Sequence, residues 1–307
     1  MPDATGASQP AVRVSVVLAT NRGGPYLTEA LASVAAQTYP HVELILVDDG
    51  AEAPAAIEAI AALFPEVRLT HIKPSGVAVA RNVGVSRTSG DVLAFLDDDD
   101  RWHPERVERH VDAMLRTPDA VVSYCGMRVV DERGVEVAPA DQRAVRNVHD
   151  VYRRSTGIMA PNLMIRRDAF TRVGGFSPAF RQAEDLDLVL RAAREGPFAF
   201  VEGTLVDYRK HGGNTTRGHR ELAGSIREVL RLHRWAALER GDGALAADLR
   251  YSLDANARFA AWSAARAARA DLRERAYSAA VGEVAWAASF APSAPWSWLR
   301  RRLGRTG

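Results

Sequence analysis

Three features are scarce in this sequence of 307 residues, and each scarcity excludes a class of protein. The single cysteine, Cys125, excludes an intramolecular disulfide framework and a multi-cysteine zinc site. No apolar run reaches the length of about 18 residues that a transmembrane helix needs. The formal net charge is only +2, from 40 basic and 38 acidic residues. Because nucleic-acid-binding domains are usually strongly basic, we expect no nucleic-acid partner.

The rest of the composition is typical of a globular enzyme. Hydrophobic residues make up 47% of the chain and charged residues 25%, which is enough apolar material for a sizeable core. The length predicts one large domain or two of ordinary size. Residues 1–10 are small and polar, without an apolar signal-peptide stretch, and we expect a disordered tail there. Together with the single cysteine, this start predicts a cytoplasmic protein.

Strand-like and helix-like segments alternate along the first hundred residues. Apolar, β-branched runs predict strands at 12–18, 42–47, 67–72 and 91–96, and helical spacing predicts helices at 26–37, 55–64 and 78–86. Nearly continuous apolar strands are typical of a parallel sheet that is covered on both faces. We therefore predict an α/β fold, with a Rossmann-like, mostly parallel sheet flanked by helices.

The pattern changes twice further along the chain. Residues 101–217 are mixed, with strands expected at 120–130, 162–165 and 198–206 and a helix at 181–194. Beyond residue 219 the sequence is rich in Ala, Arg and Leu, which predicts several helices up to residue 290 with a break near 241–243. We expect an α/β domain at 11–218 and a helical C-terminal region at 219–307.

Acidic residues follow two of the predicted strands directly. Asp48 and Asp49 end one strand, and the run Asp97 to Asp100 ends another. The carboxyl ends of parallel strands meet at one edge of the sheet, where ligands bind in such folds. Four adjacent carboxylates repel one another, and Mg²⁺ or Mn²⁺ would neutralise them. The alternative is a solvated acidic loop or helix start, but the position after a buried strand favours a metal site.

Three weaker signals each allow a second interpretation. Arg81, behind Gly76, could bring a guanidinium to an anion or be an ordinary surface arginine. Asp185 could be a general base or the cap of a helix, and spacing alone favours the cap. Arg209 and His211, on a loop with two glycines, suit a mobile phosphate clamp, although a lone histidine is more often structural.

The order of these motifs closely resembles that of the family 2 inverting glycosyltransferases, which have the GT-A fold. The resemblance covers about residues 11–215 and does not extend over 219–307. It rests on nine segments in succession: residues 14–18, 37–40, 47–50, 80–84, 90–91, 95–100, 174–176, 184–185 and 208–211. Residues 11–100 would form the nucleotide-binding half of a GT-A domain, and residues 101–218 the acceptor half.

The resemblance implies roles for the donor-binding residues. Asp49 would pair with the nucleotide base, usually uracil, and Arg81 would lie near the base or the phosphates. In the acidic run, Asp97 would face the ribose or the metal, Asp98 would fill a variable position, and Asp99 would bind the Mn²⁺ or Mg²⁺ that bridges the diphosphate.

It also implies the catalytic chemistry. Asp185 would be the general base, and His211 would contact the metal or the pyrophosphate. The expected reaction moves a sugar from a nucleoside-diphosphate sugar, usually UDP-linked, to a hydroxyl of a glycan, lipid-linked or small-molecule acceptor. We expect acceptor recognition from residues 101–180, with the C-terminal helices as an alternative. One departure from the family lies at residues 19–24, where the usual aromatic residue is missing and the loop is rich in glycine.

Two other functions and one membrane contact stay open at this point. A sugar-nucleotide-forming nucleotidyltransferase would also need an α/β sheet, a metal and acids, and a catalytically inactive nucleotide-sugar binding protein would keep the same fold. Near the end of the chain, Trp296 and Trp298 precede Arg300, Arg301 and Arg302. Such a segment could hold the protein at the inner face of a membrane, or its tryptophans could pack on the preceding helices.

Overall fold

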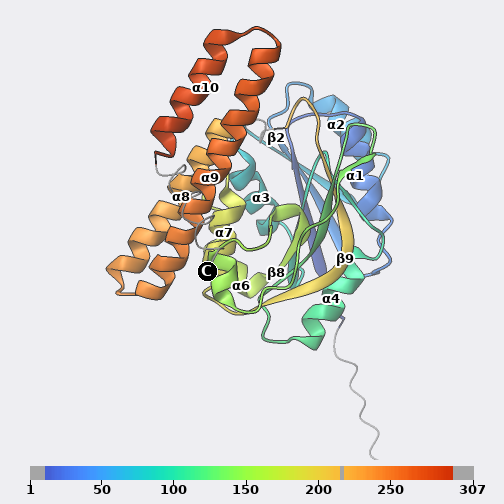
Figure 1. Cartoon of the computed structure of the whole chain (residues 1–307). Helices are drawn as coiled ribbons and strands as arrows, with labels where there is room; N and C mark the ends of the chain where they lie inside the picture. Colours follow the sequence, from blue (N-terminus) through green and yellow to red (C-terminus); the bar gives the residue numbers. More distant parts are fainter. Residues whose placement is uncertain (1–10, 215–217, 293–307) are drawn as a thin grey trace, which may run out of the picture.

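Four parallel strands form the first half of a central sheet in the computed structural model, which describes residues 11–214 and 218–292 (Figure 1). They lie in the order β3, β2, β1, β4. Thr20 pairs with Asp48 across β1 and β2, and Ala19 pairs with Asp97 across β1 and β4. Both acidic clusters therefore lie at the same edge of the sheet, as predicted. The strands are β1 (Val14–Thr20), β2 (Val42–Asp49), β3 (Val67–Ile72) and β4 (Val92–Asp97).

The second half of the sheet mixes strand directions. Its strands are β5 (Arg101–Trp102), β6 (Val122–Val130), β7 (Glu136–Ala138), β8 (Leu163–Arg166) and β9 (Phe198–Arg209). β8 runs antiparallel to both β4 and β6, whereas β9 runs parallel to β6. The strand predicted at 198–206 is longer than expected, because its pairing with β6 continues to the last pair, Val130 with Arg209. This extension brings Arg209 to the end of the acidic run.

Helices cover both faces of the sheet, as the apolar strands predicted. Val16 and Leu18 of β1 pack in one core cluster with α1, α2 and α4, whereas Val17 between them packs in the other with α3 and α7. Alternate side chains of a strand point to opposite faces, so both faces are buried. The helices of this unit are α1 (Pro25–Ala35), α2 (Pro54–Ala61), α3 (Val77–Ser86), α4 (Arg106–Arg116), α5 (Val148–Tyr152), α6 (Arg167–Arg172) and α7 (Glu184–Ala192), with a 3₁₀ turn at Ala160–Asn162.

Helix α7 begins three residues later than the predicted segment 181–194. Ala183, at its N-cap, has φ +62°, a left-handed conformation that a residue inside a right-handed α-helix cannot adopt. The turn at Ala183 therefore fixes where the helix starts. It places Glu184 and Asp185 in the first helical turn.

Three long helices pack beside this unit as an antiparallel bundle, α8 (His219–Glu239), α9 (Gly243–Arg273) and α10 (Tyr277–Phe290) (Figure 1). The predicted break at 241–243 is confirmed, since Gly241 has φ +72° between α8 and α9. His233 of α8 contacts the Asp187 carboxylate of α7 at 2.8 Å, and Arg153 contacts Asp248 of α9 at 2.6 Å. These ion pairs join the bundle to the sheet unit.

A membrane contact is one of the two alternatives predicted for the end of the C-terminal region. Among the helices of residues 11–214 and 218–292, none combines the length and the apolar character needed to cross a bilayer. The tryptophan- and arginine-rich segment that includes Trp296 and Trp298 lies outside the described residues.

Candidate active site

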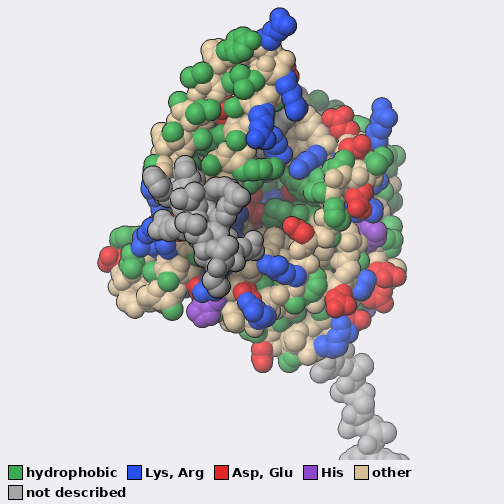
Figure 2. Space-filling view, viewed as in Figure 1, with side chains coloured by type: hydrophobic (Ala, Val, Ile, Leu, Met, Phe, Trp, Pro, Cys, Tyr) green, Lys and Arg blue, Asp and Glu red, His purple; other side chains and the backbone are tan. Residues whose placement is uncertain are grey.

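A cavity of about 1230 Å³ opens at the acidic edge of the sheet and brings together most of the predicted site residues. Figure 2 shows a hollow between the sheet unit and the C-terminal helices, with acidic and basic side chains at its margin. Asp49, Arg81, the carboxylates of 97–99 and Asp185 all line the cavity. Arg209 and His211 are not among its lining residues.

Arg81 connects the acidic run to the start of α7. Its Nη2 donates to Asp97 at 2.5 Å, and its Nη1 donates to Glu184 at 2.7 Å. The guanidinium is buried and lies over the ring of Phe176 at 5.1 Å. Because its two terminal nitrogens each donate to a carboxylate, Arg81 links the end of β4 to the start of α7. That Arg81 also lies near the base or the phosphates of the donor stays a prediction.

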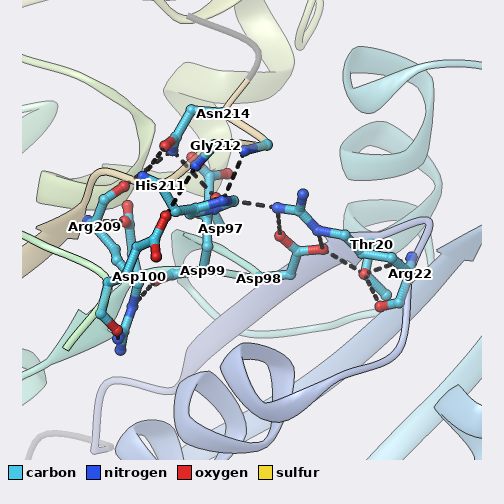
Figure 3. Close-up of polar contacts among 12 residues, drawn as sticks. Thr20, Arg22, Asp97, Asp98, Asp99, Asp100, Arg209, His211, Gly212 and Asn214 are labelled. Atoms are coloured by element: carbon cyan, nitrogen blue, oxygen red, sulfur yellow. Dashed lines mark hydrogen bonds and ion pairs between the residues drawn. The ribbon is translucent and has the colours of Figure 1, made fainter. Parts of the chain in front are cut away.

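Asp98 anchors the loop that follows β1. Its carboxylate accepts two hydrogen bonds from Arg22, from Nη2 at 2.8 Å and from Nε at 3.2 Å, and a third from the Thr20 hydroxyl at 2.5 Å (Figure 3). This bidentate arrangement is the strong geometry for an arginine and a carboxylate. Arg22 was not predicted as a site residue, and its positive charge is committed to acids rather than open to a phosphate. The glycine-rich loop at 19–24 therefore lacks the free basic group that a nucleotidyltransferase would need there.

Asp99 is the point where the acidic run meets the loop after β9. The Asp99 Oδ2 atom lies 2.8 Å from His211 Nε2 and 3.1 Å from Arg22 Nη2 (Figure 3). The backbone N–H of Gly213 donates to His211 Nδ1 at 3.0 Å, which leaves the ring proton on Nε2, where it is donated to Asp99. Burial and the nearby Asp97 carboxylate raise the pKa of Asp99, and the hydrogen bond from His211 opposes them. The predicted contact of His211 with the donor would thus be made beside Asp99.

Asn214 shapes this loop, a role that was not among the sequence-based predictions. Its Oδ1 accepts the backbone N–H of His211 at 2.5 Å, and its Nδ2 donates to the Arg209 carbonyl at 2.9 Å (Figure 3). The side chain therefore closes a short turn that holds the His211 ring against Asp99. The turn is also packed from α1, because the ring of Tyr26 lies 5.1 Å from that of His211.

The assignment of Arg209 to phosphate binding needs correction. Arg209 is only 2% exposed, and its guanidinium donates to the carbonyls of Asp99 and Glu132, both at 3.0 Å, and to the Glu29 carboxylate. Its backbone N–H donates to Asp100, whose fully buried carboxyl has a raised pKa because of burial and the neighbouring Asp97 and Asp99. The extension of β9 places Arg209 behind the acidic run, where it stabilises the fold.

We therefore expect Arg209→Ala to lower the free energy of unfolding by about 2–4 kcal/mol, because two carbonyls and a carboxylate lose their donor. Urea denaturation measures this change. Arg68→Ala is the control, since Arg68 forms an exposed ion pair with Glu43 and its loss should cost at most about 1 kcal/mol. Unchanged stability of Arg209→Ala, together with weaker UDP binding, would restore the sequence-based assignment.

Asp49 is half-buried at the end of β2 and holds the loop before α3. Its two carboxylate oxygens accept the backbone N–H groups of Ser75 at 2.7 Å and Gly76 at 2.8 Å. A carboxylate oxygen can accept more than one hydrogen bond. Asp49 therefore keeps acceptor capacity on the cavity side for the nucleotide base that it is predicted to recognise.

Asp185 lies in the first turn of α7 and faces the cavity. Its Oδ1 accepts the N–H of Leu186 at 2.7 Å within the first turn, although the N-cap of the helix is Ala183 and not Asp185. Burial raises the pKa of Asp185, while the positive charge of Arg81 opposes that rise. Burial also raises the pKa of the adjacent Glu184 to about 7. A carboxylate whose pKa is raised toward neutrality is a better general base than an exposed one.

The donor set for a metal is incomplete without a substrate. Over residues 11–214 and 218–292, no three His, Cys, Asp or Glu side chains converge on one point as a protein-only metal site requires. Asp99 and His211 offer one oxygen and one nitrogen in direct contact. Mg²⁺ and similar ions often bind one or two carboxylates and complete their coordination with substrate phosphates and water. These residues therefore fit an ion that a diphosphate helps to hold.

Later parts of the chain also line the cavity. Residues 154–159 and the segment before α7 line it, and so do Leu222 and Ile226 of α8 and Phe259 of α9. Both regions named in the expectation for acceptor recognition, 101–180 and the C-terminal helices, thus contribute to one cavity.

Comparison with known proteins places this geometry in a family. Residues 15–174 match the model of glycosyl transferase family 2. An "uncharacterized glycosyltransferase" of Rickettsia felis is 26% identical over 219 residues, which is 68% of this chain and 36% of that protein. YwdF of Bacillus subtilis, also named an uncharacterized glycosyltransferase, is 30% identical over 60% of this chain and 69% of its own. The chain thus spans about a third of the length of the Rickettsia protein.

Two further proteins carry more specific names. TuaG of Bacillus subtilis, a putative teichuronic acid biosynthesis glycosyltransferase, is 25% identical over 72% of this chain and 89% of its own. Among solved structures, Staphylococcus aureus TarS 1–349 in complex with UDP-GlcNAc has a TM-score of 0.59, with 15% identity over 93% of this chain and 92% of that one. At this level of identity the structural match shows a shared fold.

Proposed function

Because this chain belongs to glycosyl transferase family 2, we propose that it is a metal-dependent, inverting enzyme that transfers a sugar from a UDP-sugar to an acceptor hydroxyl. The observation that carries the proposal is that one cavity holds the carboxylates of 97–99, Asp49 and the half-buried Asp185. Arg81 bridges the two acidic elements through Asp97 and Glu184. The donor and the base would therefore meet in a fixed geometry.

The donor would occupy the part of the cavity at the carboxyl ends of β1, β2 and β4. Asp49 would receive the base, and the acidic run would face the ribose and the diphosphate. UDP is the proposed nucleotide because the carboxylate of Asp49 can accept a hydrogen bond from the N–H of uracil. The UDP-GlcNAc bound by TarS, which shares this fold, supports the same choice.

Asp185 would accept the proton of the acceptor hydroxyl. The hydroxyl oxygen then forms a bond to the anomeric carbon while the bond from that carbon to the diphosphate oxygen breaks, and UDP departs with the bonding electrons. Attack from the face opposite the leaving group inverts the anomeric configuration. Positioning both reactants in one cavity contributes several kcal/mol to such a step.

Asp99 and His211 would hold the divalent ion, with the diphosphate completing its coordination. When bound, Mn²⁺ or Mg²⁺ supplies Lewis-acid stabilisation of the negative charge that builds up on the departing UDP. To be a ligand through Nε2, the neutral His211 ring would carry its proton on Nδ1, in place of the hydrogen bond that Nδ1 accepts from the Gly213 N–H. Arg22 and Asp98 would keep the loop after β1 against this centre.

The test is release of UDP from a panel of UDP-sugars, with Mn²⁺ and with a chelator in its place. We expect slow hydrolysis without an added acceptor, stimulated by Mn²⁺ and abolished by the chelator. Binding of UDP, measured by calorimetry, should show the same metal dependence. Absence of both UDP binding and UDP release would contradict the proposal, and release of pyrophosphate from UTP with a sugar phosphate would indicate a nucleotidyltransferase instead.

A further inference from the structure

Most charged side chains that line the cavity are already paired. Arg22 forms ion pairs with Asp98 and Asp99, and Arg81 forms ion pairs with Asp97 and Glu184. Two arginines differ from these. Within the described residues, the guanidinium groups of Arg154 and Arg181 have neither an ion pair nor a hydrogen bond, and both side chains line the cavity and are exposed in it. Besides Asp49 and the carboxylates of 97–99, the acids among the described lining residues are Asp185, Glu184 and the exposed Asp141.

Arg154 is the better placed of the two arginines. It follows α5, and the negative charge of Asp185 acts on its guanidinium. The protein around it partly removes the water that would solvate the charge, which lowers the pKa of Arg154, and Asp185 opposes this effect. An arginine cannot lose its proton under ordinary conditions. A permanent positive charge therefore acts on the proposed base from within the same cavity.

The backbone of Arg154 has a left-handed conformation, which is unusual for an arginine. Arg154 has φ +51° and occupies the residue after the C-cap of α5, in a Schellman turn closed by Arg154 N–H to Val151 (2.9 Å) and Ser155 N–H to Asp150 (3.0 Å). Glycine is the usual residue at this position, because it alone adopts a left-handed conformation without steric cost. The chain instead has an arginine there.

The same turn recurs elsewhere and provides an internal comparison. Arg275, with φ +61°, occupies the equivalent position after α9, closed by Arg275 N–H to Leu272 (3.2 Å) and Ala276 N–H to Asp271 (2.8 Å). Arg275 does not line the cavity. The conformation alone is thus no evidence of function, and Arg154 differs from Arg275 by its unpaired charge inside the cavity.

We propose that Arg154, assisted by Arg181, binds an oxyanion on the acceptor, so that the acceptor is a phosphate- or carboxylate-bearing sugar or glycan. This inference rests on the proposed glycosyl transfer. An anionic acceptor would otherwise be repelled by Asp185, Glu184 and the acidic run as it entered. The planar guanidinium of arginine donates two parallel hydrogen bonds to either anion. Arg154 would thus orient the acceptor hydroxyl toward Asp185.

The test uses full-length protein saturated with UDP and Mg²⁺, a diamagnetic ion suited to NMR, so that the diphosphate site is closed to competitors. Glucose 6-phosphate, glucuronate and glucose are then titrated as acceptor probes, and their dissociation constants are measured by ligand-observed NMR. We expect at least one anionic probe to bind about 10-fold or more tightly than glucose, as a charge-assisted hydrogen bond implies. Comparison of the two anionic probes distinguishes phosphate from carboxylate.

Three variants separate binding from folding. Arg154→Gly should remove the advantage of the anionic probe without lowering the melting temperature, because glycine suits the turn better. Arg154→Lys should keep part of the advantage, since lysine keeps the positive charge but cannot donate two parallel hydrogen bonds to one anion. Arg275→Gly relieves the same backbone conformation outside the cavity, and we expect it to leave all three probe affinities unchanged.

Two results would overturn the inference while UDP still binds. One is equal affinity of the wild-type protein for glucose and both anionic probes. The other is an anionic preference that survives in Arg154→Gly. If the wild-type protein does not bind UDP at all, the proposed function itself fails, and the inference that rests on it fails with it.

Discussion

Replacement of Asp185 by asparagine is expected to lower sugar transfer by roughly 10²-fold or more, the usual contribution of a general base. The amide keeps the shape of the side chain and can still accept the N–H of Leu186, which Asp185 Oδ1 accepts at 2.7 Å. It cannot take the proton of the acceptor hydroxyl. Binding of UDP with Mn²⁺ should therefore change little while the rate of transfer falls. Steady-state transfer rates and calorimetric UDP affinities measure the two effects separately.

Asp168→Asn is a matched control for this variant. Asp168 lies in the first turn of α6 and accepts the N–H of the next residue, Ala169, at 2.7 Å, as Asp185 does with Leu186. It does not line the cavity. We expect Asp168→Asn to keep full transfer. If Asp185→Asn also kept nearly full transfer, Asp185 would be a helix cap and the base would have to be sought elsewhere.

Asp99→Ala is expected to weaken Mn²⁺-dependent UDP binding by at least about 10- to 100-fold, because loss of a residue that only supports a metal ligand already has an effect of that size. Asp99 contributes the carboxylate that touches His211, and alanine removes the only oxygen donor of that pair. The affinity for UDP measured with a chelator should change much less. Titration of UDP with and without Mn²⁺ gives both values for each variant.

Asp207→Asn provides the comparison for Asp99→Ala. Asp207 is also buried and paired with arginines, Arg128 at 2.6 Å and Arg101 at 3.0 Å, but it lies outside the cavity. Any general effect of removing a buried carboxylate should appear in both variants, whereas loss of metal stimulation should appear only in Asp99→Ala. An Asp99→Ala protein that binds UDP with undiminished Mn²⁺ dependence would show that the ion is held by other groups.

The sequence by itself determined the first half of the sheet and where its acids lie. Continuous apolar runs indicate buried parallel strands, because such strands are covered on both faces. Asp49 and Asp97 follow two of these runs directly, so the chain topology alone brings them to one edge. The order of short motifs similarly predicted the family, which the match over residues 15–174 shows. All these signals are local in the chain.

Only the tertiary structure decided which charged groups are free to act. The sequence places Arg209 on a loop that is predicted to bind phosphate. In the structure, pairing of β9 with β6 buries its side chain behind Asp99. Arg22 and Arg81 are neutralised by acids 76 and 16 residues away, whereas Arg154 has no partner among the described residues. A side chain's availability depends on which distant residues the fold brings within hydrogen-bond distance. Local patterns of composition and spacing carry no record of such contacts, so the roles of these arginines emerged only from the folded chain.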